Sequence, residues 1–330
     1  MADNYFNGKK VLITGSTGFI GSWLVKSLLE KKADIVCVSR DYVPKSMFFE
    51  EGLSENVTVA HGDLEDFHTI ERVVNEYFPE VVIHLGAQTI VGTANNSPLG
   101  TFNSNIKGTW NVLEACRLHD KHIKSIVVAS SDKAYGEQKK LPYTEDRPLQ
   151  GSNPYDASKS CTDLLAQCYG KTYSLPIGIS RCGNFFGGGD LNFSRIVPGT
   201  IKSVFMNNSV EIRSDGKFIR DYIYVKDAVN AYEVLAQKTE QMNFHGEAFN
   251  FSNEVQLNVL ELVGRILKLM GKDKTIKPVI KNEAVNEIRD QHLSSKKARE
   301  VLGWKSKWGI DESLVETIEW YTEWLKKLSY

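Results

Sequence analysis

The chain has 330 residues, 42% of them hydrophobic and 25% charged, which is enough for one large or two modest domains with buried cores. This composition excludes a disordered or fibrous protein. Lysine and arginine number 40 against 41 acidic residues, so the net charge of −1 provides no basic field for nucleic acid or an anionic membrane. The N-terminus lacks the features of a secretion signal, and no apolar run approaches the roughly 20 residues that span a bilayer. We therefore expect a soluble, cytoplasmic protein that binds neither nucleic acid nor membrane.

Five cysteines form an odd set without a C-x-x-C pair, which argues against both a disulfide framework and a zinc site. The seven histidines show no metal-ligand spacing with these cysteines. We expect no bound metal, and cysteines that are reduced core residues.

In the first half, short β-branched runs alternate with longer helical patterns, which is typical of βαβ units and a parallel sheet. The runs are almost continuously apolar, as strands covered by helices on both faces must be. We predict strands at 11–14, 35–39, 57–60, 81–85, 125–130 and 177–181, and helices at 18–31, 66–78, 101–119 and 154–173. Asn153 and Pro154 fit the cap and first position of the last helix. The pattern predicts an α/β fold with a doubly wound, Rossmann-type parallel sheet.

After residue 181 the alternation is interrupted by a glycine-rich loop, CGNFFGGGD. Residues 195–220 look like a helix and a short hairpin, whereas 222–237 and 248–251 look like a return to the sheet. Amphipathic helices are predicted at 257–270 and 311–328. We therefore predict a Rossmann domain from 1–185 and about 222–256, and a smaller, discontinuous C-terminal substrate domain from about 186–221 and 257–330.

Glycines in G-x-x-G-x-x-G spacing, GSTGFIG at 15–21, follow the first strand and open the first helix. A turn without side chains lets a pyrophosphate approach the backbone, and the helix N-terminus offers free N–H groups. The alternative is an ordinary glycine-rich turn. We predict a dinucleotide site that includes Gly15, Thr17, Gly18, Phe19 and Ile20.

The end of the second strand distinguishes NAD from NADP, since a carboxylate there binds the adenosine ribose and repels a 2′-phosphate. Ser39 occupies the place of the expected acid, and Arg40 can bind a phosphate, so we favour NADP. The alternative, NAD, would have Asp41 at the ribose and Arg40 as a surface charge. The next two strand ends add further predicted cofactor contacts, namely Asp63, Leu64, Leu85, Gly86 and Ala87.

Tyr155 and Lys159 are spaced i and i+4, so they lie on one face of the predicted helix. A lysine cation near a phenol lowers the phenol pKa and favours a tyrosinate that accepts a proton from a substrate alcohol. Ser131, Asp132 and Lys133 follow the fifth strand and add a hydroxyl, a carboxyl and an amine. These five residues are the predicted catalytic group.

Taken together, these motifs resemble the extended short-chain dehydrogenases/reductases that act on nucleotide sugars, and the resemblance covers nearly the whole chain. It rests on the glycine loop, GDL at 62–64, HLGA at 84–87, NIKGTWNVLEAC at 105–116, Ser130 with Ser131, Tyr155 with Lys159, RCGN at 181–184, RDYIYVKD at 220–227 and KAREVLGW at 297–304. It implies a substrate that is a nucleotide-diphosphate sugar, bound partly by the C-terminal domain. It also implies a homodimer.

Within this family, Asp132 followed by Lys133 is similar to the pattern of 4,6-dehydratases, and most similar to that of CDP-glucose 4,6-dehydratases. Residues 187–198 and 302–309 agree with that subfamily. Two positions depart from it: FIRDYIY at 218–224 has the more general nucleotide-sugar form, and Arg40 stands where an acid is expected. The resemblance therefore implies a 4,6-dehydratase and leaves the nucleotide base and the sugar open.

In this mechanism Tyr155 takes the 4-hydroxyl proton, Ser131 bonds the same oxygen and Lys159 holds the nicotinamide ribose. Asp132 protonates the departing 6-hydroxyl, and Lys133, or a water that it orders, takes the C5 proton. The resemblance places Gln88, Ser131, Asn184, Arg195, Arg220 and Arg289 at the substrate.

Each assignment has a structural alternative. Asp132 would be a turn carboxylate that caps Ala134 or Tyr135, and Lys133 a surface charge paired with it. Arg220 would pair with Asp221 or Asp227, and Arg289 with Asp290. Two other functions also stay open. One is an epimerase or reductase of the same family; the other is a non-catalytic dinucleotide sensor.

Overall fold

The computed structural model describes residues 5–283 and 287–328. Its largest element is a seven-stranded sheet in which every neighbouring pair of strands is parallel, in the order β10-β6-β5-β4-β1-β2-β3. The strands are β1 (Lys10–Thr14), β2 (Asp34–Ser39), β3 (Thr58–His61), β4 (Val81–His84), β5 (Ser125–Ala129), β6 (Ile177–Cys182) and β10 (His245–Phe251). Strands β4, β5 and β6 are buried along their whole length. The predicted doubly wound α/β fold is confirmed.

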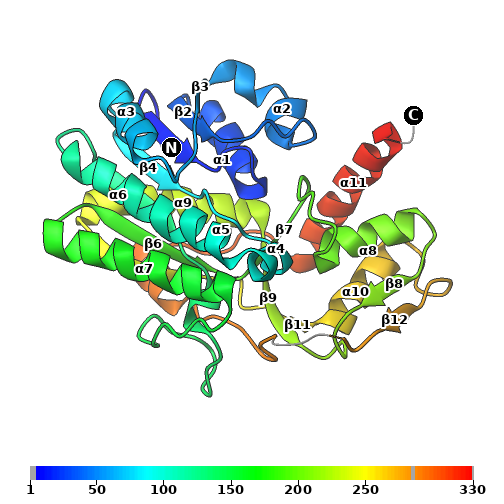
Figure 1. Cartoon of the computed structure of the whole chain (residues 1–330). Coiled ribbons are helices and arrows are strands. Elements are labelled where there is room, and N and C mark those ends of the chain that lie inside the picture. Colours follow the sequence, from blue (N-terminus) through cyan, green and yellow to red (C-terminus); the bar gives the residue numbers. More distant parts are fainter. Residues whose placement is uncertain (1–4, 284–286, 329–330) are drawn as a thin grey trace.

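Helices cover both faces of this sheet (Figure 1). One face packs against α3 (Phe67–Tyr77), α6 (Gly108–Leu118) and α7 (Pro154–Tyr173), whose apolar side chains share a core with Val36, Val82 and Val128. The other face packs against α1 (Phe19–Glu30) and α9 (Val225–Met242). The central strands β4, β5 and β6 therefore bury both sets of alternating side chains, which explains why their sequences show apolar runs without polar alternation.

The strand order reverses next to β1, which has β4 on one side and β2 on the other. At such a switch point the connections leave in opposite directions and open a crevice beyond the carboxyl ends of the strands. The predicted cofactor residues of the four segments lie at or just after the carboxyl ends of strands at this edge: Gly15, Thr17, Gly18, Phe19 and Ile20 after β1, Ser39 and Arg40 at the end of β2, Asp63 and Leu64 after β3, and Leu85, Gly86 and Ala87 after β4. The fold thus brings together segments that are up to about seventy residues apart in sequence.

The second region contains two small sheets and three longer helices, which lie to the right of the large sheet in Figure 1. One sheet has the order β11-β9-β7 and the other pairs β12 with β8. The elements are β7 (Asn184–Phe186), β8 (Val210–Ile212), β9 (Ile219–Tyr224), β11 (Gln256–Asn258), β12 (Pro278–Ile280), α8 (Ile196–Phe205), α10 (Val259–Leu269) and α11 (Ile310–Leu328).

The predicted hairpin near residues 210–220 is wrong. β8 pairs with β12, and β9 pairs with β7 and β11, because each strand buries its apolar side chains in a different cluster. α9 and β10 rejoin the large sheet, as the sequence suggested. The exact domain boundaries stay a prediction.

The remaining elements are short. They are α2 (Met47–Glu50), α4 (Val91–Asn96), α5 (Pro98–Phe102), 3-10 turns at Leu53–Asn56 and Asp132–Tyr135, and π-helical segments at Asn103–Lys107 and Ala298–Leu302. The helix predicted at 101–119 is therefore interrupted by a π segment, a feature that often marks functional sites. Among the described helices, none has the length and apolar character needed to cross a membrane.

Candidate functional site

The glycine loop between β1 and α1 is shaped by close approaches of backbone to backbone. Gly15 has φ +73°, and a Cβ there would lie 2.8 Å from the Gly86 nitrogen. A Cβ at Gly21 would lie 2.1 Å from the Gly15 carbonyl oxygen. Helix α1 begins after Gly18, where no side chain caps the helix. The helix N-terminus and the side-chain-free turn fit a dinucleotide pyrophosphate.

The adjacent strand ends supply polar groups to the same crevice. Ser39 is buried, and its hydroxyl donates a hydrogen bond to the Asp41 carbonyl oxygen. The Arg40 guanidinium is exposed and pairs with the Asp41 carboxylate at 2.7 Å. Asp63 accepts a hydrogen bond from the Glu65 amide. The predicted choice between NADP and NAD depends on Arg40 and Asp41. These two residues lie side by side just after β2 and pair with each other.

Helix α7 positions Tyr155 and Lys159. The Asn153 side chain accepts a hydrogen bond from the Asp156 amide at 3.1 Å and Pro154 is the first helical residue, so the predicted helix start is confirmed. Lys159 is 4% exposed, and its Nζ donates to the Ala129 carbonyl oxygen at 2.7 Å. This bond ties the lysine to the end of β5.

Burial raises the pKa of Tyr155 to about 12, opposed by the Arg195 cation and by a hydrogen bond with Ser131. Burial also lowers the pKa of Lys159 to about 8. Arg195 is thus the cation with the larger effect on the phenol. A dinucleotide with an oxidised nicotinamide ring would add positive charge, which favours the tyrosinate.

The segment after β5 forms a tight 3-10 turn that begins at Ser131. The Ser131 hydroxyl accepts a hydrogen bond from the Lys133 amide at 3.2 Å and donates to Asp132 Oδ1 at 3.0 Å. Asp132 is 2% exposed, and its Oδ2 has no hydrogen-bond partner among the described residues. Burial raises the pKa of Asp132, opposed by the Lys133 cation, while burial lowers the pKa of Lys133, opposed by the Asp132 carboxylate. Burial thus acts against the charged form of both groups.

Three further groups complete this cluster. Asp156 is buried beside Tyr155, with its pKa raised to about 6 by burial and partly lowered again by Lys133. Arg220, on β9, donates to the Ile219 and Arg289 carbonyl oxygens, each at 2.9 Å, and its cation lowers the pKa values of Asp132 and Lys133. The third group is Gln291, whose Oε1 accepts a hydrogen bond from Lys133 Nζ.

The predicted substrate residues are spread around this cluster. Arg195 is the residue just before α8, and its guanidinium pairs with Asp190 at 2.9 Å. Its positive charge also acts to lower the pKa of Tyr155. The Gln88 amide donates to Asn105 at 2.6 Å, and the Asn184 side chain lies 3.5 Å from a carbonyl oxygen of β9.

The two predicted arginines have different partners from those proposed as alternatives. Arg220 pairs with Glu287 at 3.4 Å, not with Asp221 or Asp227. Arg289 is exposed and pairs with Asp215 at 3.5 Å, so its guanidinium lies outside the buried cluster.

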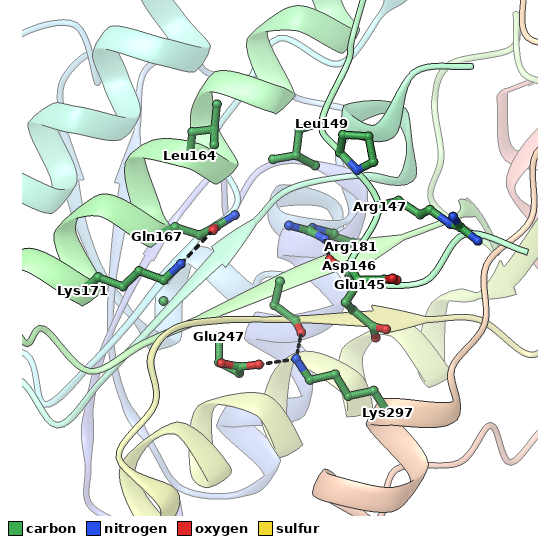
Figure 2. Close-up of a pocket in the computed structure, with 13 residues that line it drawn as sticks. Glu145, Asp146, Arg147, Leu149, Leu164, Gln167, Lys171, Arg181, Glu247 and Lys297 are labelled. Carbon is green, nitrogen blue, oxygen red and sulfur yellow. Dashed lines mark hydrogen bonds and ion pairs between the residues drawn. The ribbon is translucent and has the colours of Figure 1, made fainter. Parts of the chain in front are cut away.

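Two cavities lie near these elements. One, of about 410 Å³, is lined by Glu137, Ser152, Asn153, Glu287 and Ile288, next to the start of α7 and the partner of Arg220. The other, of about 370 Å³, lies between α7, β10 and the loop around residue 147 (Figure 2). Lys297 and Glu247 pair with each other at one wall of it. In the described part of the chain, neither cavity is lined by a predicted site residue; the first lies nearer the candidate site, because Glu287 pairs with Arg220 and Asn153 precedes helix α7.

Sequence reasoning missed Asp156, Glu287 and Gln291. Asp156 lies inside the segment that suggested Tyr155 and Lys159, and a buried carboxyl one residue after the tyrosine was the available signal. Glu287 and Gln291 lie in an irregular polar stretch whose periodicity carries no structural information. Their place in the site depends on contacts with residues 67 and 158 positions away.

Comparison with known proteins identifies the family and the fold. The sequence model for GDP-mannose 4,6 dehydratase matches residues 12–317. CDP-glucose 4,6-dehydratase of Salmonella typhimurium is 31% identical over 338 aligned residues, which cover 98% of this chain and 93% of that protein. A dTDP-glucose 4,6-dehydratase from Bacillus anthracis, solved with NAD, superposes with a TM-score of 0.85 at 26% identity, covering 97% of this chain and 100% of the other. UDP-glucose 4-epimerase from Thermotoga maritima gives 0.86 at 28% identity, covering 96% and 99%.

Proposed function

This chain belongs to the GDP-mannose 4,6-dehydratase family, and from that premise we propose which residues, substrate and cofactor it uses. The predictions of an extended short-chain dehydrogenase/reductase, of an enzyme and of a nucleotide-sugar 4,6-dehydratase are confirmed. The product of that reaction is a nucleotide-linked 4-keto-6-deoxy sugar.

One observation carries the assignment of residues. Asp132, which is buried, and Lys133, which is partly buried, share one turn, where burial raises the pKa of the carboxyl and lowers the pKa of the amine, and Asp132 Oδ2 has no hydrogen-bond partner among the described residues. Elimination of water needs an acid for the leaving hydroxyl and a base for the C–H bond, held close together. A surface ion pair would show the reverse shifts, with a low pKa for the carboxyl and a high pKa for the amine.

The residues perform the following steps. Tyr155 accepts the proton of the sugar 4-hydroxyl, and Ser131 bonds the same oxygen. A dinucleotide held at the glycine loop and by Lys159 would supply the redox chemistry, that is, hydride transfer at C4 and C6. Once C4 is a ketone, Lys133 takes the C5 proton, the C–H electron pair forms the C5–C6 double bond, and Asp132 protonates the departing 6-hydroxyl. Lys133 then returns a proton to C5.

For the substrate we propose a nucleoside-diphosphate hexose with free 4- and 6-hydroxyls, and CDP-glucose as the first candidate. The support is the Salmonella relative, which is a CDP-glucose enzyme, together with the Asp-Lys pair. Arg220 is the proposed diphosphate contact because it is nearly buried and cationic, at the edge of the catalytic cluster. Asn184, Arg195 and Arg289 are proposed as secondary contacts, and Gln88 as a sugar contact.

We propose NADP as the preferred cofactor. The residues proposed to hold it are Gly15, Thr17, Gly18, Phe19, Ile20, Ser39, Arg40, Asp63, Leu64, Leu85, Gly86, Ala87, Tyr155 and Lys159. The support is the exposed Arg40 guanidinium at the end of β2, which pairs with Asp41 and also feels the charges of Asp63 and Glu65, and which could turn toward a 2′-phosphate. NAD is the alternative, and the Bacillus anthracis dehydratase was solved with NAD.

A homodimer is proposed as well. The outward faces of α6 and α7 expose Trp110, Leu118, Leu164 and Tyr173, a set of large apolar side chains on neighbouring helices. Burying such side chains against a second copy of the same helices is favourable.

The decisive experiment incubates the purified protein with CDP-glucose, dTDP-glucose, UDP-glucose, UDP-N-acetylglucosamine and GDP-mannose separately and measures the mass of each product. Loss of one water, abolished by Asp132→Asn with C4 oxidation retained, would support the proposal and identify the nucleotide. Inversion at a sugar carbon without loss of water would instead select the epimerase reading. Absence of turnover with all five donors would contradict the proposed substrate.

A further inference from the structure

The amine of Lys133 has an unusual set of neighbours. The carboxyl groups of Asp132, Asp156 and Glu287 and the guanidinium of Arg220 all act on it electrostatically. None of the described carboxylates comes within ion-pair distance of this amine; its hydrogen-bond partner is the neutral amide of Gln291. Asp132 Oδ2 and Asp156 Oδ1, both shielded from solvent, have no hydrogen-bond partner among the described residues. The lysine is thus held by an amide although carboxylates are near.

Gln291 is itself rigidly placed. It is 0% exposed, and its backbone amide donates to the Ile219 carbonyl oxygen at 3.2 Å. Two residues later, the Leu293 amide donates to the buried Asp221 carboxylate at 3.0 Å. The side-chain nitrogen of Gln291 has no hydrogen-bond partner among the described residues, so the bond to Lys133 is what orients the amide. Because the Gln291 side chain is buried and its backbone is hydrogen-bonded, the side chain can hold the Lys133 amine in one position.

The chemistry of the base explains why an amide suits this place. A neutral amine has two N–H bonds and one lone pair. A carbonyl oxygen that accepts one N–H leaves the lone pair free for the C5 proton. A carboxylate in the same place would stabilise the ammonium form and remove the base at neutral pH.

We propose that Gln291 is a positioning residue that aims the Lys133 amine at the C5 proton while leaving it free to act as a base. The inference rests on the proposed function, in which Lys133 is the base. It adds a residue from the C-terminal half of the chain, 158 positions away, to the machinery of the elimination step.

The first test separates elimination from oxidation. Gln291→Leu, Lys133→Ala and the double variant are compared for reduced cofactor formed at C4 oxidation, for deuterium entering C5 from solvent, and for loss of water. We expect Gln291→Leu to lower kcat for water loss and deuterium entry by roughly 100-fold, with KM and C4 oxidation little changed. The double variant should be no slower than Lys133→Ala, because Gln291 acts through the lysine.

The second test uses the matched variant Gln291→Glu, which keeps an oxygen acceptor and the side-chain length. The new carboxylate would raise the pKa of the Lys133 amine, as Asp132, Asp156 and Glu287 already do, whereas Arg220 lowers it. The acid limb of the kcat–pH profile should move to higher pH by about one unit or more, with activity recovering at alkaline pH. A merely structural role would lower the unfolding temperature without moving this profile.

The outcomes distinguish the two proposals. If Lys133→Ala abolishes deuterium entry but Gln291→Leu leaves it intact, or if the losses of the two variants multiply, the positioning role is refuted and the proposed function stands. If Lys133→Ala retains full deuterium entry, the base assignment and the positioning role both fail, while water loss by the wild type would still support a dehydratase.

Discussion

The two glycines Gly15 and Gly8 allow the cofactor crevice to be tested with a matched pair of variants. Both have left-handed backbone conformations, with φ of +73° and +74°. A Cβ at Gly15 would lie 2.8 Å from the Gly86 nitrogen, whereas no described heavy atom lies within 4 Å of a Cβ at Gly8. Alanine at either place carries the same conformational cost, and only at Gly15 does it also push two backbone segments apart.

We expect Gly8→Ala to destabilise the protein by about 1–2 kcal/mol, the cost of a left-handed L-residue. Gly15→Ala adds an overlap with backbone that has no flexible end to move, so its total should be about 2–5 kcal/mol. The displaced turn also carries the proposed pyrophosphate contacts. Each 1.4 kcal/mol lost in binding is tenfold in Kd, and we expect at least tenfold weaker dinucleotide binding for Gly15→Ala.

Urea unfolding gives the free energies, and titration calorimetry with NADP and NAD gives the affinities. Gly8→Ala should leave both Kd values unchanged, because this residue precedes β1 at the opposite end of the strand. Unaltered binding by a folded Gly15→Ala variant would refute the placement of the pyrophosphate at this turn.

Three further predictions concern cofactor choice, pH and assembly. Arg40→Ala should weaken NADP binding at least tenfold more than NAD binding, whereas Asp41→Asn should not weaken NADP; calorimetry that finds NAD preferred by the wild type would contradict the NADP proposal. Burial lowers the pKa of His84 to about 3, whereas the pKa in the unfolded chain is about 6.5. Between these two values only the unfolded state binds a proton at His84, so the free energy of unfolding decreases as the pH is lowered from about 6.5. The stability advantage of the wild type over a folded His84→Asn variant should therefore shrink by up to about 1.4 kcal/mol per pH unit between pH 6 and 4. Leu164→Glu should yield monomers in light scattering, whereas Leu269→Glu, exposed on α10, should not; monomeric wild type would rule out the dimer.

The sequence predicted those parts of the fold that depend on residues close together in the chain. The cap at Asn153 and Pro154 and the strand ends are set by short-range chemistry, and the structure places them as expected. The glycine loop was also predictable, since Gly15 and Gly21 are needed for close backbone contacts.

Long-range packing decided what the sequence did not predict. The pairing of β8 with β12 and the bond between Gln291 and Lys133 join segments that share no pattern. The π segment at Asn103–Lys107 also interrupts a helix whose apolar spacing looked continuous. The prediction of core cysteines is wrong for Cys168, which is exposed, and for Cys161, which is only partly buried, because both lie on α7 away from its buried residues.

The pairing of β10 with β6 has a consequence for engineering. Part of the second region precedes α9 and β10 in the sequence. β10 is the edge strand of the large sheet, and α9 covers one face of that sheet. A fragment that stops near residue 185 would leave β6 without its neighbour and an apolar face open to water, and should aggregate. To exchange substrate specificity between relatives, both segments of the second region, about 186–221 and 257–330, would have to be grafted onto one Rossmann domain. Fusing the N-terminal half of one protein to the C-terminal half of another would instead join β6 and β10 from different proteins in one sheet.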